Sequence, residues 1–444
     1  MEKTKADVVI GTYCGDEGKG KTIDLLATEA DIAVRATGGD NAGHSVDVKG
    51  KKYALHILPC GILSPHVTGV IGNGVMVNPL KLINELMQLE ASGFQIMNKD
   101  ITRLKLSHSA NLIMPYYIDL DMAMEEARKN KIGTTMRGIG PGYMYKAARD
   151  GFRVGDLFHE DFAEHVKHET EIAKKLMDAY TGVEDSIHYM AWASAPHFDA
   201  DIIIKDYMRY ADMLKPFVCD TAAFLHHALE DGKKVVIEGA QAALLDIDHG
   251  TSPFVTSSNP TIGGILSGTG LSASDIGNVY GITKAYASKV GAGPFPTRLD
   301  NETGDMIRKL GHEYGVTTGR PRDCGWLDLV ALKYAKRING ITGIVLNHLD
   351  TIGKFPEFGV CTAYKADGTI TYDYFTDINF LQNAEPVLKM FEGWTGEDIS
   401  GMTEYELLPE NAKKFIEFVE YYIGVPIVCI GTGAGRDDVI RREI

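Results

Sequence analysis

Apolar residues along the chain fall into two alternating patterns, short continuous runs and longer segments with helical spacing. Runs of the first kind are predicted strands, at 6–11, 31–35, 51–58, 67–71, 234–238, 279–282, 341–346 and 425–430. Segments of the second kind are predicted helices, at 22–29, 79–91, 327–338 and 411–422. Strands that alternate with helices predict an α/β fold, with a large, mostly parallel central sheet flanked by helices.

The stretch from about 155 to 233 departs from this alternation. Glycine nearly disappears there, while His and charged residues accumulate between apolar residues at three- and four-residue spacing. This pattern predicts a mostly helical elaboration of the α/β fold. Elsewhere the chain has no internal repeat, no Pro/Ser/Gly-rich linker and no low-complexity tail, so we expect residues 1–444 to form a single α/β domain.

Composition narrows the possible partners and the compartment. The chain has 60 acidic and 45 basic side chains, a formal net charge of −15, and an acidic surface repels a nucleic-acid backbone. No apolar run approaches the roughly 18 residues of a membrane span. The six cysteines are scattered without a CxxC pair, which is typical of free thiols in a reducing compartment. We therefore expect a cytoplasmic protein that binds neither nucleic acid nor membrane.

A phosphate-binding loop is predicted near the N-terminus, between the first strand and the first helix. Gly15-Asp-Glu-Gly-Lys-Gly-Lys-Thr22 fits the pattern G-x-x-x-x-G-K-[ST]. In such P-loops, glycines let backbone amides turn toward a phosphate, and the helix N-terminus and a lysine add positive potential. Asp16 and Glu17 are unusual there, because carboxylates repel phosphate. A carboxylate at this place indicates magnesium coordination or proton abstraction, whereas the alternative is a glycine-rich turn that binds nothing.

Two further loops contain candidate phosphate ligands. The loop at 38–44 follows a strand and ends in His44, a candidate acid or donor to a phosphoryl oxygen. The segment 133–141 combines two hydroxyls, three glycines and Arg137, which suits phosphate as well as an ordinary structural loop.

Other polar residues suit recognition of an amide, a carboxylate or a base. Gln241 follows the strand at 234–238, at the edge of a parallel sheet where ligands collect. The sequence Thr317-Thr-Gly-Arg-Pro-Arg322 places two guanidinium groups beside hydroxyls, as a carboxylate clamp requires. Asp350 follows the strand at 341–346 and can accept the two donors that distinguish guanine from adenine; the alternative for this residue is a helix N-cap.

Taken together and in order, these segments resemble the adenylosuccinate synthetase family from Gly11 to Arg436, nearly the whole chain. The matching motifs are Gly-Asp-Glu-Gly-Lys-Gly-Lys at 15–21, Asn-Ala-Gly-His at 41–44, Gly-Thr-Thr at 133–135, Arg-Gly-Ile-Gly-Pro at 137–141, Glu-Gly-Ala-Gln at 238–241, Leu-Leu-Asp-Ile-Asp-His-Gly-Thr at 244–251, Val-Thr-Ser-Ser-Asn at 255–259, Val-Gly-Ala-Gly-Pro-Phe-Pro-Thr at 290–297 and Thr-Thr-Gly-Arg at 317–320. So many motifs in one order are highly specific to the family.

The resemblance implies a ligase of AMP biosynthesis that forms adenylosuccinate from IMP and L-aspartate. GTP would be hydrolysed to GDP and phosphate, and a 6-phosphoryl-IMP would be the intermediate. By residue, it implies that Asp16 is the general base for N1 of IMP, and that His44 and Lys19 stabilise the phosphoryl group. Magnesium would be held by Asp16 and by the backbone carbonyl of Gly43.

The resemblance also implies which positions bind the substrates. For IMP they are Asn41, Thr135, Gln241 and Thr256, together with Arg149, which would reach the active site of the neighbouring subunit in a homodimer. For L-aspartate they are Thr317, Thr318 and Arg320. For the triphosphate nucleotide they are Gly15, Glu17, Gly18, Gly20, Lys21, Ser45, Arg322, His348, Asp350, Gly431 and Gly433.

The sequence departs from the family pattern mainly around the nucleotide pockets. His348 stands where a lysine is usual, and the loop Gly431 to Arg436 lacks the usual Pro-Asp. These departures leave open a relative that uses ATP as donor or dGMP as acceptor, although Asp16 favours IMP. A P-loop GTPase switch protein is the alternative from another class, because Asn347-His-Leu-Asp350 is similar to the guanine-recognition segment of such proteins.

Overall fold

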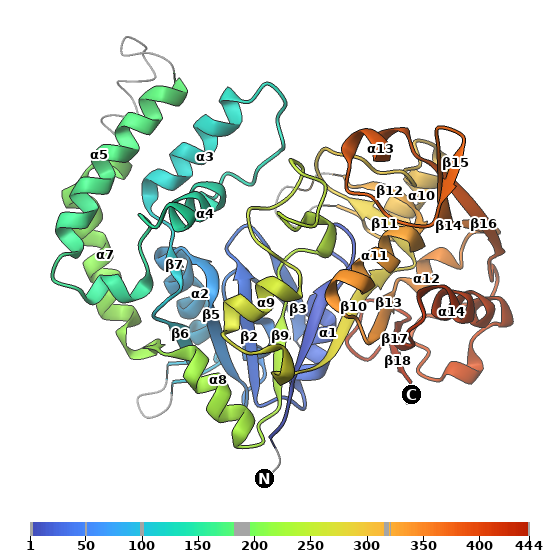
Figure 1. Ribbon diagram of the computed structural model, residues 1–444. Coiled ribbons are helices and arrows are strands. Elements are labelled where there is room, and N and C mark those ends of the chain that lie inside the picture. The colour runs from blue at the N-terminus through green and yellow to red at the C-terminus, as the bar shows by residue number, and fades with distance from the viewer. Residues whose placement is uncertain are drawn as a thin grey trace.

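A large central sheet runs through the computed structural model, which describes residues 3–48, 51–97, 102–181, 196–314, 319 and 321–442 (Figure 1). Its strands are β1 (Ala6–Gly11), β2 (Ile32–Gly38), β5 (Thr68–Val77), β6 (Leu104–Ser107), β7 (Asn111–Leu112), β8 (Val218–Cys219), β9 (Val235–Glu238), β10 (Ile276–Lys284), β13 (Gly343–Asn347), β17 (Ile427–Gly431) and β18 (Val439–Arg441). Their order is β18-β17-β13-β10-β1-β9-β2-β5-β6-β8, with β7 beside β5.

The central sheet is mostly parallel, as predicted. Strand β1 pairs in parallel with β10 on one side and β9 on the other, and β9 pairs in parallel with β2. Within the described part of the sheet, β18 is the antiparallel strand, at the edge next to β17. All seven residues of β2 are buried, as expected of a strand with both faces covered.

Helices cover both faces of this sheet and create two hydrophobic cores. They include α1 (Lys19–Ala27), α2 (Pro79–Ala91), α8 (Thr221–Glu230), α9 (Ile262–Thr269), α11 (Leu329–Asn339) and α14 (Glu410–Ile423). Val9 of β1 belongs to the core that contains Ile23 of α1. Its neighbours Val8 and Ile10 belong to the other core, with Phe415 of α14. The division follows from the alternation of side chains along a strand.

A group of helices projects from one side of the sheet (Figure 1). It consists of α3 (Pro115–Ala127), α4 (Ile139–Ala148), α5 (Phe162–Thr181) and α7 (Ala200–Leu214), which leads into α8. Helices α5, α7 and α8 lie within the stretch 155–233, so the helical character predicted there is confirmed for its described residues. No helix was predicted at α4, because Gly140, Pro141 and Gly142 in its first turn are typical of loops.

A smaller sheet, which the sequence pattern did not predict, lies on the opposite side. Its strands are β11 (Tyr286–Lys289), β12 (Asp323–Asp328), β14 (Glu357–Ala366), β15 (Thr369–Thr371) and β16 (Glu385–Glu392), accompanied by α10 (Glu302–Leu310) and α13 (Ile378–Asn383). The remaining elements are the hairpin β3 (His44–Val48) and β4 (Lys51–Leu55) and the short helix α12 (Leu349–Ile352). Among the described residues, no helix combines the length and apolar character needed to cross a bilayer.

Candidate active site

The carboxyl ends of six parallel strands meet at one edge of the central sheet. These strands are β17, β13, β10, β1, β9 and β2, which are neighbours in that order. Ligands of open α/β folds bind outside such an edge. Most of the predicted site residues within the described part of the chain follow these strands: Asp16 follows β1, Gln241 follows β9, Asn41 and His44 follow β2, His348 and Asp350 follow β13, and Gly433 follows β17.

The predicted P-loop is a tight turn that leads into α1. Gly15, Asp16 and Gly18 all have positive φ, of 93°, 59° and 95°. At Gly18 a side chain has no room, because a Cβ atom there would lie 2.8 Å from Nδ2 of Asn347. The Asn347 amide itself donates to the backbone carbonyl of Glu17 over 2.8 Å. The end of β13 therefore holds the loop against β1.

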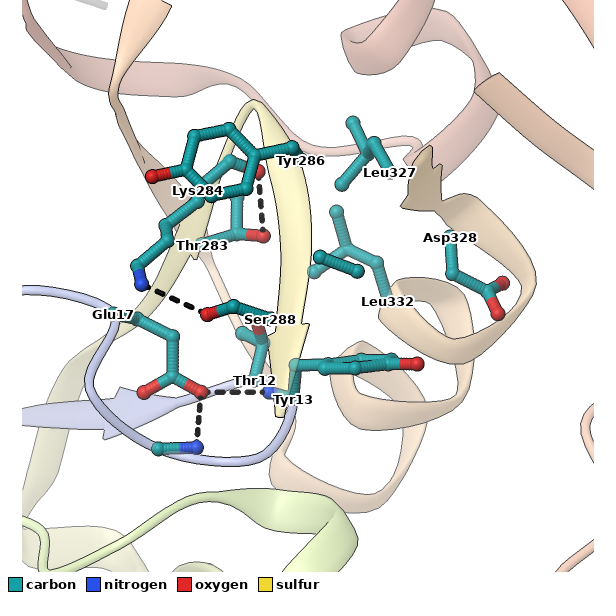
Figure 2. Close-up of a pocket in the computed structure, with 12 residues that line it drawn as sticks. Thr12, Tyr13, Glu17, Thr283, Lys284, Tyr286, Ser288, Leu327, Asp328 and Leu332 are labelled. Atoms are coloured by element: carbon teal, nitrogen blue, oxygen red, sulfur yellow. Dashed lines mark hydrogen bonds between the residues drawn. The ribbon is translucent and has the colours of Figure 1, made fainter. Parts of the chain in front are cut away.

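The two carboxylates of the loop have different surroundings. Glu17 is buried, and its Oε1 accepts the backbone N–H groups of Tyr13 at 3.0 Å and Gly15 at 2.8 Å (Figure 2). Its Oε2 lies 3.1 Å from Nζ of Lys19. The side chain of Asp16 is 44% exposed, and its Oδ2 lies 2.7 Å from a guanidinium nitrogen of Arg322. Glu17 thus shapes the loop, whereas Asp16 is accessible to a ligand.

A small cavity lies beside the loop, between the ends of β1, β10, β11 and β12 (Figure 2). Thr12, Tyr13, Lys284 and Asp328 are among its lining residues. Its volume of about 10 Å³ is enough for a single water molecule and excludes a nucleotide. Nucleotide substrates must therefore bind outside this cavity, which Asp16 does not line.

His44 lies in a buried group of polar side chains that we call the His44 network, formed by Arg35, His44 and Glu238. The Nδ1 atom of His44 contacts Oε1 of Glu238, and a guanidinium nitrogen of Arg35 lies 3.2 Å from both ring nitrogens. Burial, together with the Arg35 charge, lowers the pKa of His44 well below its usual value. A neutral ring satisfies both contacts when Nδ1–H donates to Glu238 and Nε2 accepts from Arg35.

His44 and Glu238 also lie close to Cys60, so that ligand atoms of the three residues fall within 4.8 Å of one another. Arg35 argues against a metal ion there, because its guanidinium is 3.6 Å from Glu238 and already supplies the positive charge. The mixed nitrogen, sulfur and oxygen donors of this group also differ from the oxygen ligands that a hard cation such as magnesium prefers.

Several buried polar atoms around the His44 network have no hydrogen-bond partner among the described residues. They are Nε of Arg35, Oγ1 of Thr37, Oδ1 of Asp40, Oδ1 of Asn41 and both amide atoms of Gln241. The loop after β2 and Gln241 lie close together, since a Cβ atom on Gly38 would lie 3.3 Å from Oε1 of Gln241. Burying an unpaired polar group costs about 1–3 kcal/mol. Such a cluster at a sheet edge indicates a ligand that supplies the missing partners.

A second buried group, which we call the Glu313 network, lies on the other side of the loop and consists of Lys284, Tyr286, Glu313 and Arg322. Oε1 of Glu313 accepts from Nζ of Lys284 at 2.5 Å and from the hydroxyl of Tyr286 at 2.6 Å. Its Oε2 accepts from Arg322 at 2.7 Å. Burial alone would raise the pKa of Glu313, but Lys284, Tyr286 and Arg322 lower it to about 2.

The predicted base-recognition residues lie beside the Glu313 network. His348 has a φ of 61° and caps α12, which makes the N-cap alternative for Asp350 wrong. The His348 ring packs against the Tyr286 ring with centroids 5.4 Å apart, and burial lowers its pKa to about 3, so it is neutral. Asp350 is half-buried, and burial raises its pKa. The neutral His348 ring and the Asp350 carboxylate can therefore both contact a nucleotide base, and neither brings a positive charge to it.

Lys21 joins the P-loop to the C-terminal loop. Its Nζ donates to the carbonyls of Gly433 at 2.8 Å and Asp438 at 3.0 Å. Gly431 ends β17, where a Cβ atom would lie 2.6 Å from Oδ1 of Asn347, and Gly20 is buried within α1. The C-terminal loop is therefore held at the same sheet edge as Asp350.

The remaining predicted residues are exposed, half-buried or undescribed. Thr135 and Arg149 are exposed, and Oγ1 of half-buried Thr256 is 3.5 Å from Oγ of Ser258. Thr317, Thr318 and Arg320 lie outside the described residues, as does the side chain of Ser45.

Sequence reasoning did not single out Arg35, Lys284 or Glu313, which the structure places at the site, nor did it predict that Asn347 holds the P-loop. Arg35 could have been recognised from the sequence, because it is a charged residue within a predicted apolar strand. No sequence pattern indicates the roles of Lys284, Glu313 and Asn347, because these roles depend on contacts between segments that are distant in the sequence.

Known proteins match this chain over nearly its full length. The family model described as adenylosuccinate synthetase matches residues 8–440. An adenylosuccinate synthetase of Acetivibrio thermocellus is 46% identical over 435 residues, 98% of each chain. A fully ligated adenylosuccinate synthetase of Plasmodium falciparum is 40% identical with a TM-score of 0.88, covering 98% of this chain and 99% of that one. A succinoaminodeoxyadenylate synthetase of cyanophage S-2L, bound to dGMP and dATP, is 16% identical with a TM-score of 0.60 over 99% and 96%, which shows the fold alone.

Proposed function

Because the chain belongs to the adenylosuccinate synthetase family, whose members join IMP to L-aspartate in purine biosynthesis with GTP, we propose that Asp16 is the general base of this ligase reaction. The observation that carries the proposal is the surroundings of Asp16. It is the accessible carboxylate of the P-loop, paired with Arg322 at the edge where Gln241 and Asn41 leave buried amide atoms unpaired. A base is needed there, because a lactam oxygen is a poor nucleophile until N1 loses its proton.

Once N1 is deprotonated, O6 of IMP attacks the γ-phosphate, and the amine of aspartate then displaces the 6-phosphoryl group. Charge spreads over the phosphoryl oxygens during transfer, so Lys19 and His44 contribute by electrostatic stabilisation. In the structure both nitrogens of His44 are engaged by Glu238 and Arg35. Donation to a phosphoryl oxygen therefore requires the ring to turn away from Arg35.

The divalent metal that the family's nucleotide substrates require is, in our proposal, magnesium. Its ligands from this chain would be the carboxylate of Asp16 and the carbonyl of Gly43, an all-oxygen set of the kind magnesium prefers. When bound, magnesium neutralises phosphate charge. Asp16 is suited to the role because it is half-exposed and its Oδ2 already faces a cation, Arg322.

The substrates divide between the two sides of the loop. The unpaired amide atoms of Asn41 and Gln241, with Thr135 and Thr256, would bind IMP on the side of the His44 network. Asp350 and His348 would bind the guanine, with the P-loop backbone, Lys21, Arg322, Ser45 and the Gly431–Gly433 loop around the rest of GTP. Thr317, Thr318 and Arg320 would bind aspartate.

We also propose a cytoplasmic homodimer, with residues 1–444 as one domain. Arg149 ends α4 in the left-handed region, with a φ of 73°, and is exposed. Its Nε donates to the carbonyl of Ala148 at 3.3 Å, which leaves the end of the guanidinium for an IMP phosphate in the partner's site.

The test is a substrate matrix at fixed L-aspartate, crossing GTP and ATP with IMP and dGMP, with phosphate release as the readout. We expect release with GTP and IMP together, and none when either IMP or aspartate is omitted. Release from GTP alone would favour a switch protein. A preference for ATP or dGMP would contradict the proposed nucleotides and leave the ligase chemistry intact.

A further inference from the structure

Among the residues that the structure describes, the side chain that holds the accessible carboxylate of the P-loop is Arg322. The two ends of this guanidinium bridge two acids, since one nitrogen lies 2.7 Å from Oδ2 of Asp16 and another 2.7 Å from Oε2 of Glu313. Asp16 lies in a glycine-rich turn at positive φ, where the backbone alone fixes a side chain weakly. The place of Asp16 therefore depends on what fixes Arg322.

Glu313 is the fixed end of this bridge. Its side chain is 1% exposed, and its second oxygen is fastened by Lys284 and Tyr286, from the ends of β10 and β11. Lys284 is tied in turn to Ser288 over 2.9 Å, as Figure 2 shows. The backbone adds a further tie, because the N–H of Arg322 donates to the carbonyl of Glu313 over 3.0 Å. A guanidinium bound at one end to so rigid an anchor keeps one orientation.

The same strand ends hold the P-loop at a second point. Lys284 of β10 pairs in register with Asn347 of β13, and the Asn347 amide binds the Glu17 carbonyl. The loop is thus fastened by its backbone through Asn347 and by its exposed side chain through Arg322. We propose that Glu313 is a positioning residue of the ligase reaction, which fixes Arg322 and through it aims Asp16 at the purine. This inference rests on the proposed role of Asp16.

The test is a double-mutant cycle of Glu313→Gln and Arg322→Gln, with kcat, KM for IMP and melting temperature as readouts. If Glu313 acts through Arg322, Glu313→Gln lowers kcat about 10- to 100-fold with KM changed by less than about threefold, because misplacing a reacting group costs rate. The double variant should then be no slower than Arg322→Gln alone. Losses that multiply, or a folded Glu313→Gln with unchanged kcat, would overturn the proposal.

Two controls separate positioning from folding. Asp275→Asn removes a buried carboxylate that pairs with Lys3 at 2.7 Å and lies before β10, at the opposite end of that strand. It should lower the melting temperature without changing kcat. If Glu313→Gln cannot fold because it leaves the Lys284 ammonium without its carboxylate partner, a second variant replaces it in the double-mutant cycle. That variant combines Glu313→Gln with Lys284→Met and so removes the uncompensated charge. Full turnover in Asp16→Asn would overturn the role of Asp16 itself, a result distinct from additivity in the cycle.

Discussion

The two buried networks beside the P-loop differ in how completely their polar atoms are paired. Around the His44 network, atoms of Arg35, Thr37, Asp40, Asn41 and Gln241 lack partners among the described residues. In the Glu313 network both carboxylate oxygens, the ammonium and the phenol are paired, and Nε of Arg322 is the atom left over. A protein tolerates unpaired buried groups where a ligand completes them. The side of the His44 network, where IMP is proposed to bind, therefore keeps atoms free for a ligand, whereas the buried residues of the Glu313 network mainly hold one another and the loop. We call these the binding side and the holding side.

The largest effect is expected at Asp16, where the two sides meet. Asp16→Asn keeps the size of the side chain and removes its ability to take a proton. We expect kcat to fall about 10²- to 10⁴-fold, the usual contribution of a general base, with the melting temperature unchanged. Phosphate release with GTP, IMP and aspartate measures it. The control is Asp206→Asn on α7, which should keep full activity; wild-type turnover in Asp16→Asn would refute the assignment.

A substitution in the Glu313 network should lower the stability of the protein. Lys284→Met removes a cation from the buried Glu313 carboxylate, which still keeps Arg322. We expect the free energy of unfolding to fall by about 3–4 kcal/mol, because breaking a buried ion pair leaves a charge less compensated. Urea denaturation measures this. Lys233→Met is the matched control, since Lys233 is 52% exposed and pairs with Asp31 at 3.4 Å. An equal loss in both variants would mean that the network does not hold the fold.

The binding side was largely predictable from the sequence, and the holding side was not. Asp16, Asn41, His44 and Gln241 follow predicted strands in glycine-rich loops, so local pattern and the geometry of parallel strands bring them to one edge. Glu313 meets Lys284 across 29 positions of chain. Contacts of this kind, like the smaller sheet, depend on tertiary packing that local periodicity does not encode.

A second buried carboxylate on the holding side, Asp328, tests whether a cation is what makes the burial of such a group favourable. Asp328 is bonded by the neutral groups Tyr364 Oη and Ala331 N–H, and burial raises its pKa to about 6. A raised pKa means that the folded state prefers the protonated acid, so stability falls as pH rises from about 4 through 6. Relative to the wild type, Asp328→Asn should gain about 2–3 kcal/mol of unfolding free energy between pH 4 and 7 in urea titrations. A difference in unfolding free energy between the two proteins that stays constant from pH 4 to 7 would contradict this expectation.

The smallest expected change in stability, at Gln241, tests the difference between the two networks most directly. Gln241→Met keeps the length of the side chain and removes two amide atoms that have no partner within the described part of the chain. We expect KM for IMP to rise about 10- to 100-fold, through lost hydrogen bonds to the ligand. The substrate-free protein should be as stable as the wild type or up to about 1 kcal/mol more stable, because an unpaired buried amide is a cost.

The control for this change is Gln382→Met on exposed α13, which should alter neither quantity. A Gln241→Met variant that loses stability while its KM for IMP is unchanged would place Gln241 among the holding residues. The unpaired atoms would then be no sign of a ligand. The opposite pair of results is a raised KM for IMP with stability retained in Gln241→Met, and lost stability with a normal KM for IMP in Lys284→Met. It would show that IMP binding and the bracing of the fold lie on opposite sides of one loop, because an atom reserved for a ligand cannot also be used to brace the fold.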